Sequence, residues 1–338
     1  MSSVDNLETP ARFTDPAVES SALRVGCGLV DRSWIARLEI CGADRYRFLN
    51  GLISSNVQDL EAGRNVYGFL TNLQGRVLAD VYVIALEDRL WLELPPGRAE
   101  TIKDHLEKYR VADRVDIFLL EDLFPLTLFG EERNAVLARA GAEPCPADQN
   151  RRCTVFGTEL QLSGRRLYRA ESTTLWVSSS VVGDVWQELQ SAADAQPVGF
   201  EALEALRIEN GVGRWGQDYD DNNLPQETGL VEEAVDFTKG CYLGQEIVAR
   251  VHYLGQPSKL LQPLQVAGGK RPEEGSPLLF AEQEVGRLTS VAESPEGSPN
   301  GFVGLSVLKR LAVEAAAAGA EAIRLADGRA VALRESTG

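Results

Sequence analysis

The residues with the clearest chemical potential lie in the segment KGCYLGQEIVAR, residues 239–250. Cys241 follows a glycine, which leaves its backbone accessible, and Lys239 lies two residues away, where a cation would favour the thiolate form of the cysteine. Tyr242 offers a flat face to an aromatic ligand, and Arg250 can receive a carboxylate through two hydrogen bonds. The segment therefore suits a reactive thiol beside an anion-binding pocket, and its alternative is a loop with a structural role only.

A second glycine-rich segment, residues 211–216, has the G-x-G-x-x-G spacing of dinucleotide-binding loops. That function requires a strand before the glycines and a helix after them, because the helix N-terminus meets the pyrophosphate. Here a predicted helix over 200–210 precedes the glycines and the polar segment 217–221 follows them. The order of elements disfavours a dinucleotide site, and the sequence contains no G-x-x-x-x-G-K-[ST] loop.

The cysteines and histidines form no metal-binding pattern. The five cysteines are widely separated and include no C-x-x-C pair: Cys27, Cys41, Cys145, Cys153 and Cys241. His105 lies beside apolar positions of a predicted helix and is expected to be structural, whereas His252 follows the motif and is a weaker candidate to reach its cysteine. We expect no metal site and no permanent iron–sulfur cluster, since a [4Fe–4S] cluster normally uses four thiolates. Transient ligation shared with a partner stays open.

Charge and hydropathy limit the classes of partner. The chain has 338 residues and a formal net charge of −16, which disfavours nucleic acid because such binding depends on neutralising phosphates. Residues 1–24 lack the basic and apolar regions of a signal peptide, and no stretch reaches the roughly 20 apolar residues of a membrane-spanning helix. We therefore expect a cytoplasmic protein that contacts neither nucleic acid nor membrane directly.

The hydrophobic pattern predicts an α+β fold. The predicted strands are 35–40, 66–71, 76–86, 89–94, 115–119, 124–129, 154–162 and 174–180, and the predicted helices are a short one after 44 and those over 99–109, 131–139, 183–192 and 200–210. Adjacent hairpins with interspersed helices favour this class over a parallel doubly wound sheet. Residues 211–257 are expected to form a long functional loop, and 259–336 a small antiparallel barrel.

The motif at 239–250 resembles the signature K-G-C-Y-x-G-Q-E-x-x-A-R of the YgfZ family of folate-binding proteins, which is related to the aminomethyltransferase (T-protein) of the glycine cleavage system. Residues 205–211 resemble the L-R-x-E-x-G segment of this superfamily, 224–227 fit the stretch before the cysteine, and 67–80 resemble its Y-x-x-x-x-N-x-x-G-x-x-x-x-D hairpin. The resemblance implies a T-protein-like fold around a central folate cleft. Its parts would be a flexible arm over 1–24, two intertwined α+β subdomains over 25–256 and an antiparallel β-barrel over 257–338.

The resemblance also implies a function. The cofactor would be tetrahydrofolate or another reduced folate, and the role would be the assembly or repair of iron–sulfur proteins, including enzymes that modify tRNA. Cys241 would be the reactive group, and the partners would be iron–sulfur client or assembly proteins.

Candidate folate contacts follow from the chemistry of the ligand. The pterin presents two adjacent donors that one carboxylate can accept, and the family places an acid at Glu209, which would otherwise be a solvated charge at a helix end. The folate carboxylates need local cations, for which the candidates are Arg207, Lys239 and Arg250. Trp215 and Tyr242 can stack on the ring systems, or belong to the core.

The alternative function is folate-dependent aminomethyl or one-carbon transfer of the T-protein type. Such an enzyme needs a carboxylate near the reacting folate nitrogen. The resemblance implies that this aspartate follows an Asn-Ala segment at the end of a strand, where this chain has Leu-Pro-Pro-Gly-Arg at 94–98. The nearest acids are Glu93, Glu100 and Asp104, and none matches that position securely.

Overall fold

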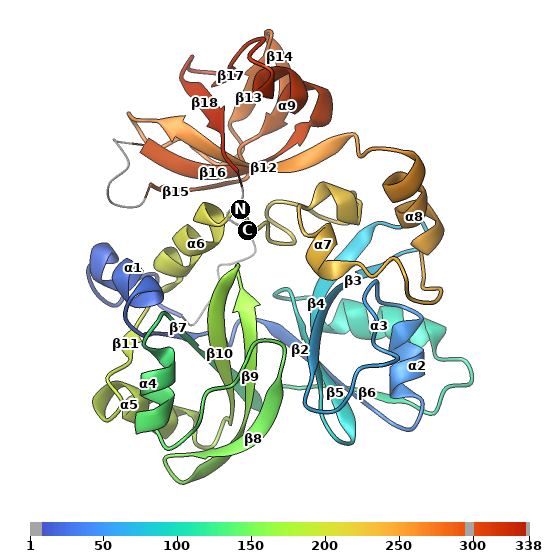
Figure 1. The fold of residues 1–338 in the computed structure, drawn as a ribbon, viewed down its shortest axis with the longest axis vertical. Coiled ribbons are helices and arrows are strands. Elements are labelled where there is room, and N and C mark those ends of the chain that lie inside the picture. Colours follow the sequence, from blue (N-terminus) through green and yellow to red (C-terminus); the bar gives the residue numbers. More distant parts are fainter. Residues whose placement is uncertain (1–8, 295–300, 336–338) are drawn as a thin grey trace. The chain divides into compact units, whose positions relative to one another are not determined.

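A computed structural model describes residues 9–294 and 301–335 of the chain, which group into two compact units. Unit 1 comprises the described residues up to Leu70 together with Ala79–Leu203, and unit 2 comprises Thr71–Leu78 and the described residues from Glu204 onward. Figure 1 shows the helices and strands of both units. Residues 204–256, predicted to belong to the preceding α+β region, group with the C-terminal residues. The division into an arm over 1–24, an α+β region over 25–256 and a barrel over 257–338 remains a prediction.

Unit 1 is built on two sheets (Figure 1). One has the strand order β11-β1-β7-β10-β9-β8, formed by β1 (Gly28–Asp31), β7 (Leu123–Phe129), β8 (Asn150–Val155), β9 (Thr158–Leu167), β10 (Ala170–Ser178) and β11 (Gln196–Pro197). The other has the order β3-β4-β5-β2-β6, formed by β2 (Ala36–Cys41), β3 (Asn65–Thr71), β4 (Val77–Ala85), β5 (Arg89–Leu94) and β6 (Asp116–Leu119). Their hairpins confirm the predicted α+β class and most of the predicted strands.

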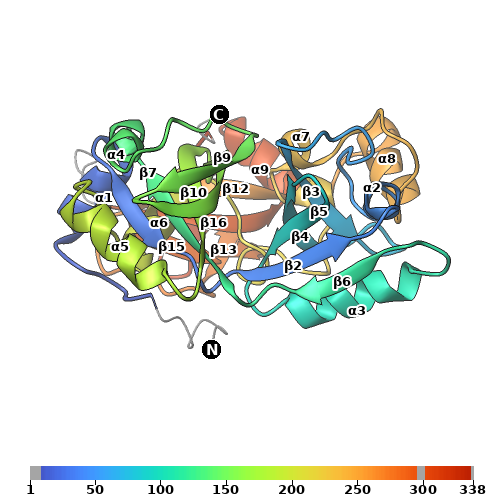
Figure 2. The same ribbon diagram turned by 90° about the horizontal axis from the view of Figure 1, so that it is seen from below.

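The helices of unit 1 cover these sheets through apolar faces. They are α1 (Pro16–Arg24), α2 (Arg45–Asn50), α3 (Ala99–Tyr109), α4 (Arg133–Arg139) and α5 (Val182–Ser191), while α6 (Phe200–Glu209) leads into unit 2. Helix α3 has the predicted bounds and packs beside β6, as Figure 2 shows, with Ile102 and Leu106 buried. Helices α4 and α5 bury Val136, Leu137 and Leu189 in a common core with β7, β9 and β10. Burial of such side chains stabilises the unit by about 1.5–3 kcal/mol each.

The predicted flexible arm contains an ordered helix. Residues 1–8 lie outside the described residues, but Pro16–Arg24 form α1. The fully buried carboxylate of Glu19 explains the order, because it accepts hydrogen bonds from the backbone N–H groups of Phe13 and Thr14 at 2.6 Å and of Gly199 at 2.8 Å. A single acid thus fixes this segment to the body of unit 1. The polar composition of residues 1–24 gives no indication of this contact.

Unit 2 contains a curled, seven-stranded antiparallel sheet that corresponds to half of a barrel (Figure 1). Its order is β14-β13-β17-β18-β12-β16-β15, formed by β12 (Lys259–Ala267), β13 (Pro277–Phe280), β14 (Gln283–Arg287), β15 (Ser290–Glu293), β16 (Gly301–Lys309), β17 (Ile323–Leu325) and β18 (Ala330–Leu333). Helix α9 (Arg310–Ala317) contributes Ala312 and Val313 to its core. The predicted antiparallel C-terminal region is confirmed in this form.

The expected long loop is partly helical. Within 211–257 the chain forms a 3-10 turn (Pro225–Glu227), α7 (Val231–Ala234) and α8 (Gln245–Leu254). Only Val248 of α8 is buried. The sequence of this helix therefore lacks a clear repeat of buried apolar residues from which it could have been predicted.

None of the helices in the described ranges combines the length and the apolar character needed to cross a membrane.

Candidate functional site

The motif loop in unit 2 presents one exposed thiol beside two buried polar side chains. Cys241 is exposed and carries a free thiol. Its neighbours Lys239 and Tyr242 are only 8% and 7% exposed, and the Lys239 Nζ lies 5.3 Å from the centroid of the Tyr242 ring, within cation–π range. The loop therefore brings three of the predicted site residues into one small region.

Burial gives the Lys239 ammonium unusual acidity. Desolvation lowers the pKa of Lys239 to about 8, against the opposing charge of Asp236. The Asp236 carboxylate accepts hydrogen bonds from the hydroxyl and backbone N–H of Thr238 and from the N–H of Lys239, and these bonds lower the pKa of Asp236. Lys239 is thus a cation that can release its proton near neutral pH, or keep it when an anion binds.

Tyr242 has a buried hydroxyl with no hydrogen-bond partner among the described residues. Desolvation raises the pKa of this phenol, so it stays neutral. A buried hydroxyl without a partner costs roughly 1–3 kcal/mol. A ligand that supplied a polar atom here would recover part of that cost.

The tip of the β3–β4 hairpin, residues 71–78, holds the motif loop in place. The Thr71 Oγ1 donates a hydrogen bond to the Leu243 carbonyl at 2.5 Å. Gly244 has a φ of +83°, and a Cβ added there would lie 2.3 Å from the Asn72 carbonyl oxygen. The loop and the hairpin turn therefore interlock at a point where only glycine fits.

Trp215 is attached to the same hairpin tip. Its Nε1 donates to the Val77 carbonyl at 3.1 Å, and the Val77 N–H donates to the Asn223 carbonyl at 2.9 Å. The indole is partly exposed. The hairpin tip thus supports both Trp215 and the motif loop, which lie about 25 residues apart in sequence.

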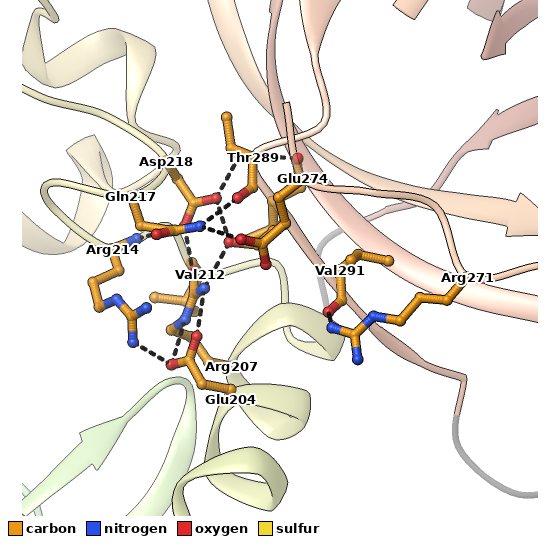
Figure 3. A network of polar contacts seen from close by, with 12 residues as sticks. Glu204, Arg207, Val212, Arg214, Gln217, Asp218, Arg271, Glu274, Thr289 and Val291 are labelled. Atoms are coloured by element: carbon orange, nitrogen blue, oxygen red, sulfur yellow. Dashed lines mark hydrogen bonds and ion pairs between the residues drawn. The ribbon is translucent and has the colours of Figure 1, made fainter. Parts of the chain in front are cut away.

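Arg207 lies at the centre of a separate buried network in unit 2 (Figure 3). Its fully buried guanidinium donates to the carboxylate of Asp218 at 2.6 Å, the Val212 carbonyl at 2.6 Å, the Ser290 hydroxyl at 2.8 Å and the carboxylate of Glu204 at 3.0 Å. These contacts join α6, the glycine-rich turn and β15. The predicted role of Arg207 toward a folate carboxylate stays a prediction, and the contacts found are structural.

The same network surrounds Asp218 and Arg214. Asp218 also accepts hydrogen bonds from the hydroxyls of Thr289 at 2.5 Å and Ser290 at 2.7 Å, and Arg214 donates to Glu204 at 2.6 Å (Figure 3). The G-x-G-x-x-G turn therefore serves as a junction with the C-terminal sheet, consistent with the expectation that it is no dinucleotide loop.

Glu209 and Arg250 lie at accessible positions. Glu209 is the last residue of α6, is partly exposed, and its backbone carbonyl accepts a hydrogen bond from Arg334 at 3.3 Å. Arg250 is exposed on α8. Their predicted contacts with a pterin and a carboxylate remain predictions.

Unit 1 contains a carboxyl group that the sequence analysis did not assign. The Tyr67 hydroxyl on β3 donates to the Asp80 Oδ2 on β4 at 3.1 Å. Desolvation raises the pKa of Asp80, and the hydrogen bond from Tyr67 opposes this only in part. Both residues belong to the hairpin over 67–80 that resembles the family. The sequence motif therefore included Tyr67 and Asp80, but it gave neither of them a chemical role. A carboxyl whose pKa is raised in this way is typical of a functional site.

Glu93, by contrast, is a carboxylate locked in its charged form. It is buried, and its Oε1 accepts hydrogen bonds from Arg165 at 2.6 Å and from Arg32. Desolvation alone would raise the pKa of Glu93, but the charges of Arg165 and Arg32 hold it below its usual range. Of the acids considered at the end of β5, Glu93 is therefore unsuited to exchange a proton.

The comparisons with known proteins agree with this fold. A sequence model of the family described as GCVT N-terminal domain matches residues 1–239. The chain belongs to this family.

Similar proteins of this family carry the name aminomethyltransferase. That of Symbiobacterium thermophilum is 25% identical over 307 residues, which cover 85% of this chain and 80% of that protein. That of Nostoc sp. is 26% identical over 312 residues, covering 87% of this chain and 81% of that protein. The crystal structure of the glycine cleavage system aminomethyltransferase T from Bartonella henselae superposes with a TM-score of 0.85 at 20% identity, covering 97% of this chain and 90% of that one. The predicted T-protein-like fold is confirmed.

Apart from Glu209 and Arg250, which lie at the accessible positions described above, the candidate residues of this GCVT-family chain fall into three groups. Lys239, Cys241 and Tyr242 share one loop, and Trp215 is held by the same hairpin tip. Arg207 belongs to the junction around Asp218. The third group, Asp80 with Tyr67, was found only through the structure. The predicted folate cleft that would unite them remains a prediction.

Proposed function

We propose that this chain binds a reduced folate, first of all tetrahydrofolate, and transfers a one-carbon unit as an aminomethyltransferase does. Family membership and the names of its relatives support the reaction class. The observation that carries the proposal is the Asp80 carboxyl, whose pKa is raised by desolvation and whose Oδ2 accepts a hydrogen bond from the Tyr67 hydroxyl. A folate nitrogen that forms a bond to carbon must lose a proton, and a positioned carboxyl of raised pKa is suited to that task.

The remaining residues receive roles in ligand binding. Glu209 accepts the paired donors of the pterin, and Trp215 and Tyr242 stack on the ring systems. Lys239 and Arg250 neutralise the carboxylates of the folate tail, which a chain of net charge −16 would otherwise repel. Because its donors are engaged by Asp218 and Glu204, we assign Arg207 to the support of this site.

A second candidate is a folate-dependent factor in the assembly or repair of iron–sulfur proteins, including tRNA-modifying enzymes. One observation favours it: the cysteine of the motif is exposed, in a loop that contacts the hairpin tip through Thr71 and Gly244. An exposed thiol can engage an iron–sulfur client or assembly protein, whereas proton management at a folate nitrogen does not require it.

Calorimetric titration with tetrahydrofolate tests the shared part of both proposals. We expect binding by the native chain and at least a tenfold loss of affinity in Glu209→Ala, about 1.4 kcal/mol. Glu201→Ala, on the same helix and exposed, is the matched control. If the native chain does not bind tetrahydrofolate, the folate-binding proposal is wrong. If Glu209→Ala binds it with native affinity, the assignment of Glu209 to the pterin is wrong.

Two further assays separate the candidates. Turnover of an aminomethyl donor with tetrahydrofolate by both the native chain and Cys241→Ala would establish the transferase without the thiol. Intact folate binding without turnover, together with failure of Cys241→Ala to restore iron–sulfur enzyme activity in a deletion strain, would favour the maintenance factor.

A further inference from the structure

The two sheets of unit 1 meet at a buried ion triad. Glu93 of β5 lies between Arg32, which follows β1, and Arg165 of β9, and both guanidinium groups donate to the same carboxylate oxygen. All three side chains are buried. Two cations and one anion leave one positive charge in excess inside the unit.

This triad belongs to a row of polar side chains on one sheet face. Tyr82 pairs directly with Glu93 across β4 and β5, and Asp80 lies two residues before Tyr82, so the three side chains share a face. The Arg165 guanidinium lies over the Tyr82 ring, 4.5 Å from its centroid. From β3, Tyr67 completes the row by its hydrogen bond to Asp80.

A purely structural role accounts poorly for this arrangement. Burying three charges costs several kcal/mol per ion, and well-packed apolar side chains often join two sheets as well or better. The Nε atoms of Arg32 and Arg165 are buried without a hydrogen-bond partner in the described part of the chain. The excess charge calls for an anion nearby, and the row offers one group that can become such an anion, Asp80.

The groups that act on Asp80 come from every strand packed against it. Tyr67 of β3, Glu93 of β5 and Arg165 of β9 act on it directly. Arg32 and Arg37 act through Glu93: Arg32 by its hydrogen bond, and the half-buried Arg37 of β2 by its charge, since it pairs with Glu93 across β2 and β5. Desolvation and Glu93 favour the neutral carboxyl, while Arg165 and Tyr67 favour the carboxylate. The balance among these groups decides how easily Asp80 changes its charge.

We propose that the Arg32–Glu93–Arg165 triad is a positioning unit whose excess positive charge stabilises the Asp80 carboxylate that remains after Asp80 releases its proton. This inference rests on the proposed function of Asp80. In the cycle, the carbon of the aminomethyl donor forms a bond to the folate nitrogen while its bond to the amine breaks. The Asp80 carboxyl gives its proton to that amine, which leaves as ammonia, and the resulting carboxylate takes up the proton lost by the folate nitrogen. The triad itself gains and loses no proton.

A carbon-13 NMR titration of the Asp80 carboxyl, assigned through Asp80→Asn, tests the inference without folate. Glu93→Gln leaves the triad with two positive charges and should move the titration midpoint of Asp80 to lower pH by about one unit. Arg165→Gln should move it to higher pH by a similar amount, while Arg165→Lys keeps the charge and should leave it nearly unchanged. The pH profile of turnover should move in the same directions.

Opposite displacements cannot arise from loss of stability, since both neutral variants weaken the same triad. Should Arg165→Gln fail to fold, Arg32→Gln takes its place with the same expected direction. Midpoints that stay fixed, or that move together in one direction, overturn the inference. The NMR midpoints decide the role of the triad, and the turnover assay decides the proposed function separately.

Discussion

Two carboxyl groups in unit 1, those of Glu93 and Asp80, differ in pKa because their surroundings differ. Glu93 touches two guanidinium groups, which lower its pKa, while Asp80 accepts a hydrogen bond from the Tyr67 hydroxyl and has its pKa raised by desolvation. The two are close enough for the charge of Glu93 to act on Asp80. Carboxyl groups whose pKa values are driven apart in this way are typical of acid–base sites.

For Asp80 we predict a selective loss of turnover. Asp80→Asn keeps the shape and the contact with Tyr67 but cannot exchange a proton, so the rate of one-carbon transfer should fall by roughly 10²–10⁴-fold. Tetrahydrofolate affinity in the calorimeter should change less than about threefold, a difference below 1 kcal/mol. Glu100→Gln, an exposed acid of α3, is the control. Normal turnover by Asp80→Asn would exclude Asp80 from the chemistry.

For Lys239 we predict a specific dependence of stability on pH. Its pKa is about 8 in the folded chain and near 10.5 when unfolded. Between these values the unfolded chain binds more protons, so this residue makes the free energy of unfolding rise with pH from about 8 to about 10.5, by up to about 3 kcal/mol. Urea unfolding across this range should show the rise in the native chain and lose it in Lys239→Met. Lys259→Met, at an exposed lysine, should keep the rise. An equal dependence of the free energy of unfolding on pH in the native chain and both variants would contradict the burial of the Lys239 ammonium.

The motif around Cys241 is visible in the sequence, whereas the surroundings of Asp80 are not, for a physical reason. Cys241 is recognisable because its neighbours are adjacent in the chain. The environment of Asp80 depends on desolvation and on charges that belong to residues 93 and 165, which only tertiary pairing brings near. Spacing in a sequence does not report such an environment.

At the scale of elements, periodicity predicted the strands and helices whose burial is one-sided. Helix α3, with apolar residues every three or four positions, has the predicted bounds. Helix α8 escaped prediction because it buries little and is fixed by the hairpin tip and by the backbone of Gly244. Helix α1 within the predicted arm over 1–24 also escaped prediction, because Glu19 holds it through a backbone contact far away in sequence.

The interlock between the hairpin tip and the motif loop predicts a large effect of one methyl group. Gly244→Ala places a Cβ 2.3 Å from a backbone oxygen at a φ of +83°, and should lower the free energy of unfolding by about 2–4 kcal/mol. Gly216 has the same φ with open space around its added Cβ. Gly216→Ala should therefore lose only about 1 kcal/mol, the backbone term alone. Equal losses in urea unfolding would show that the contact with the hairpin is unimportant.

The junction around Arg207 leads to a second prediction for these elements. Arg207→Met leaves the buried carboxylates of Asp218 and Glu204 without their main cation, and should cost about 3–5 kcal/mol of stability. Arg271→Met, which removes a single bond to the Val291 carbonyl, should cost less than about 1 kcal/mol. Retained stability with lost tetrahydrofolate affinity in Arg207→Met would instead assign this arginine to the ligand.

At the scale of the whole molecule, the excess of acids acts on stability through self-repulsion. The net charge of −16 is spread over one chain, and folding brings these charges closer together than in the unfolded chain. Salt screens exposed charges over a Debye length of about 10 Å at 0.1 M. It also weakens exposed ion pairs such as Arg12–Glu201, but each of these contributes only about 0–1 kcal/mol.

Repulsion among many charges should therefore outweigh the loss of these pairs. We predict that the thermal unfolding midpoint rises by about 3 °C or more when sodium chloride is raised from roughly 0.02 to 0.5 M. Potassium chloride should raise the midpoint equally, because screening depends on ionic strength. An uncharged osmolyte of matched osmolality, added at low salt, should not raise it in the same way. A midpoint that falls steadily with salt would mean that exposed ion pairs dominate, and that acidic self-repulsion is not what limits the stability of this chain.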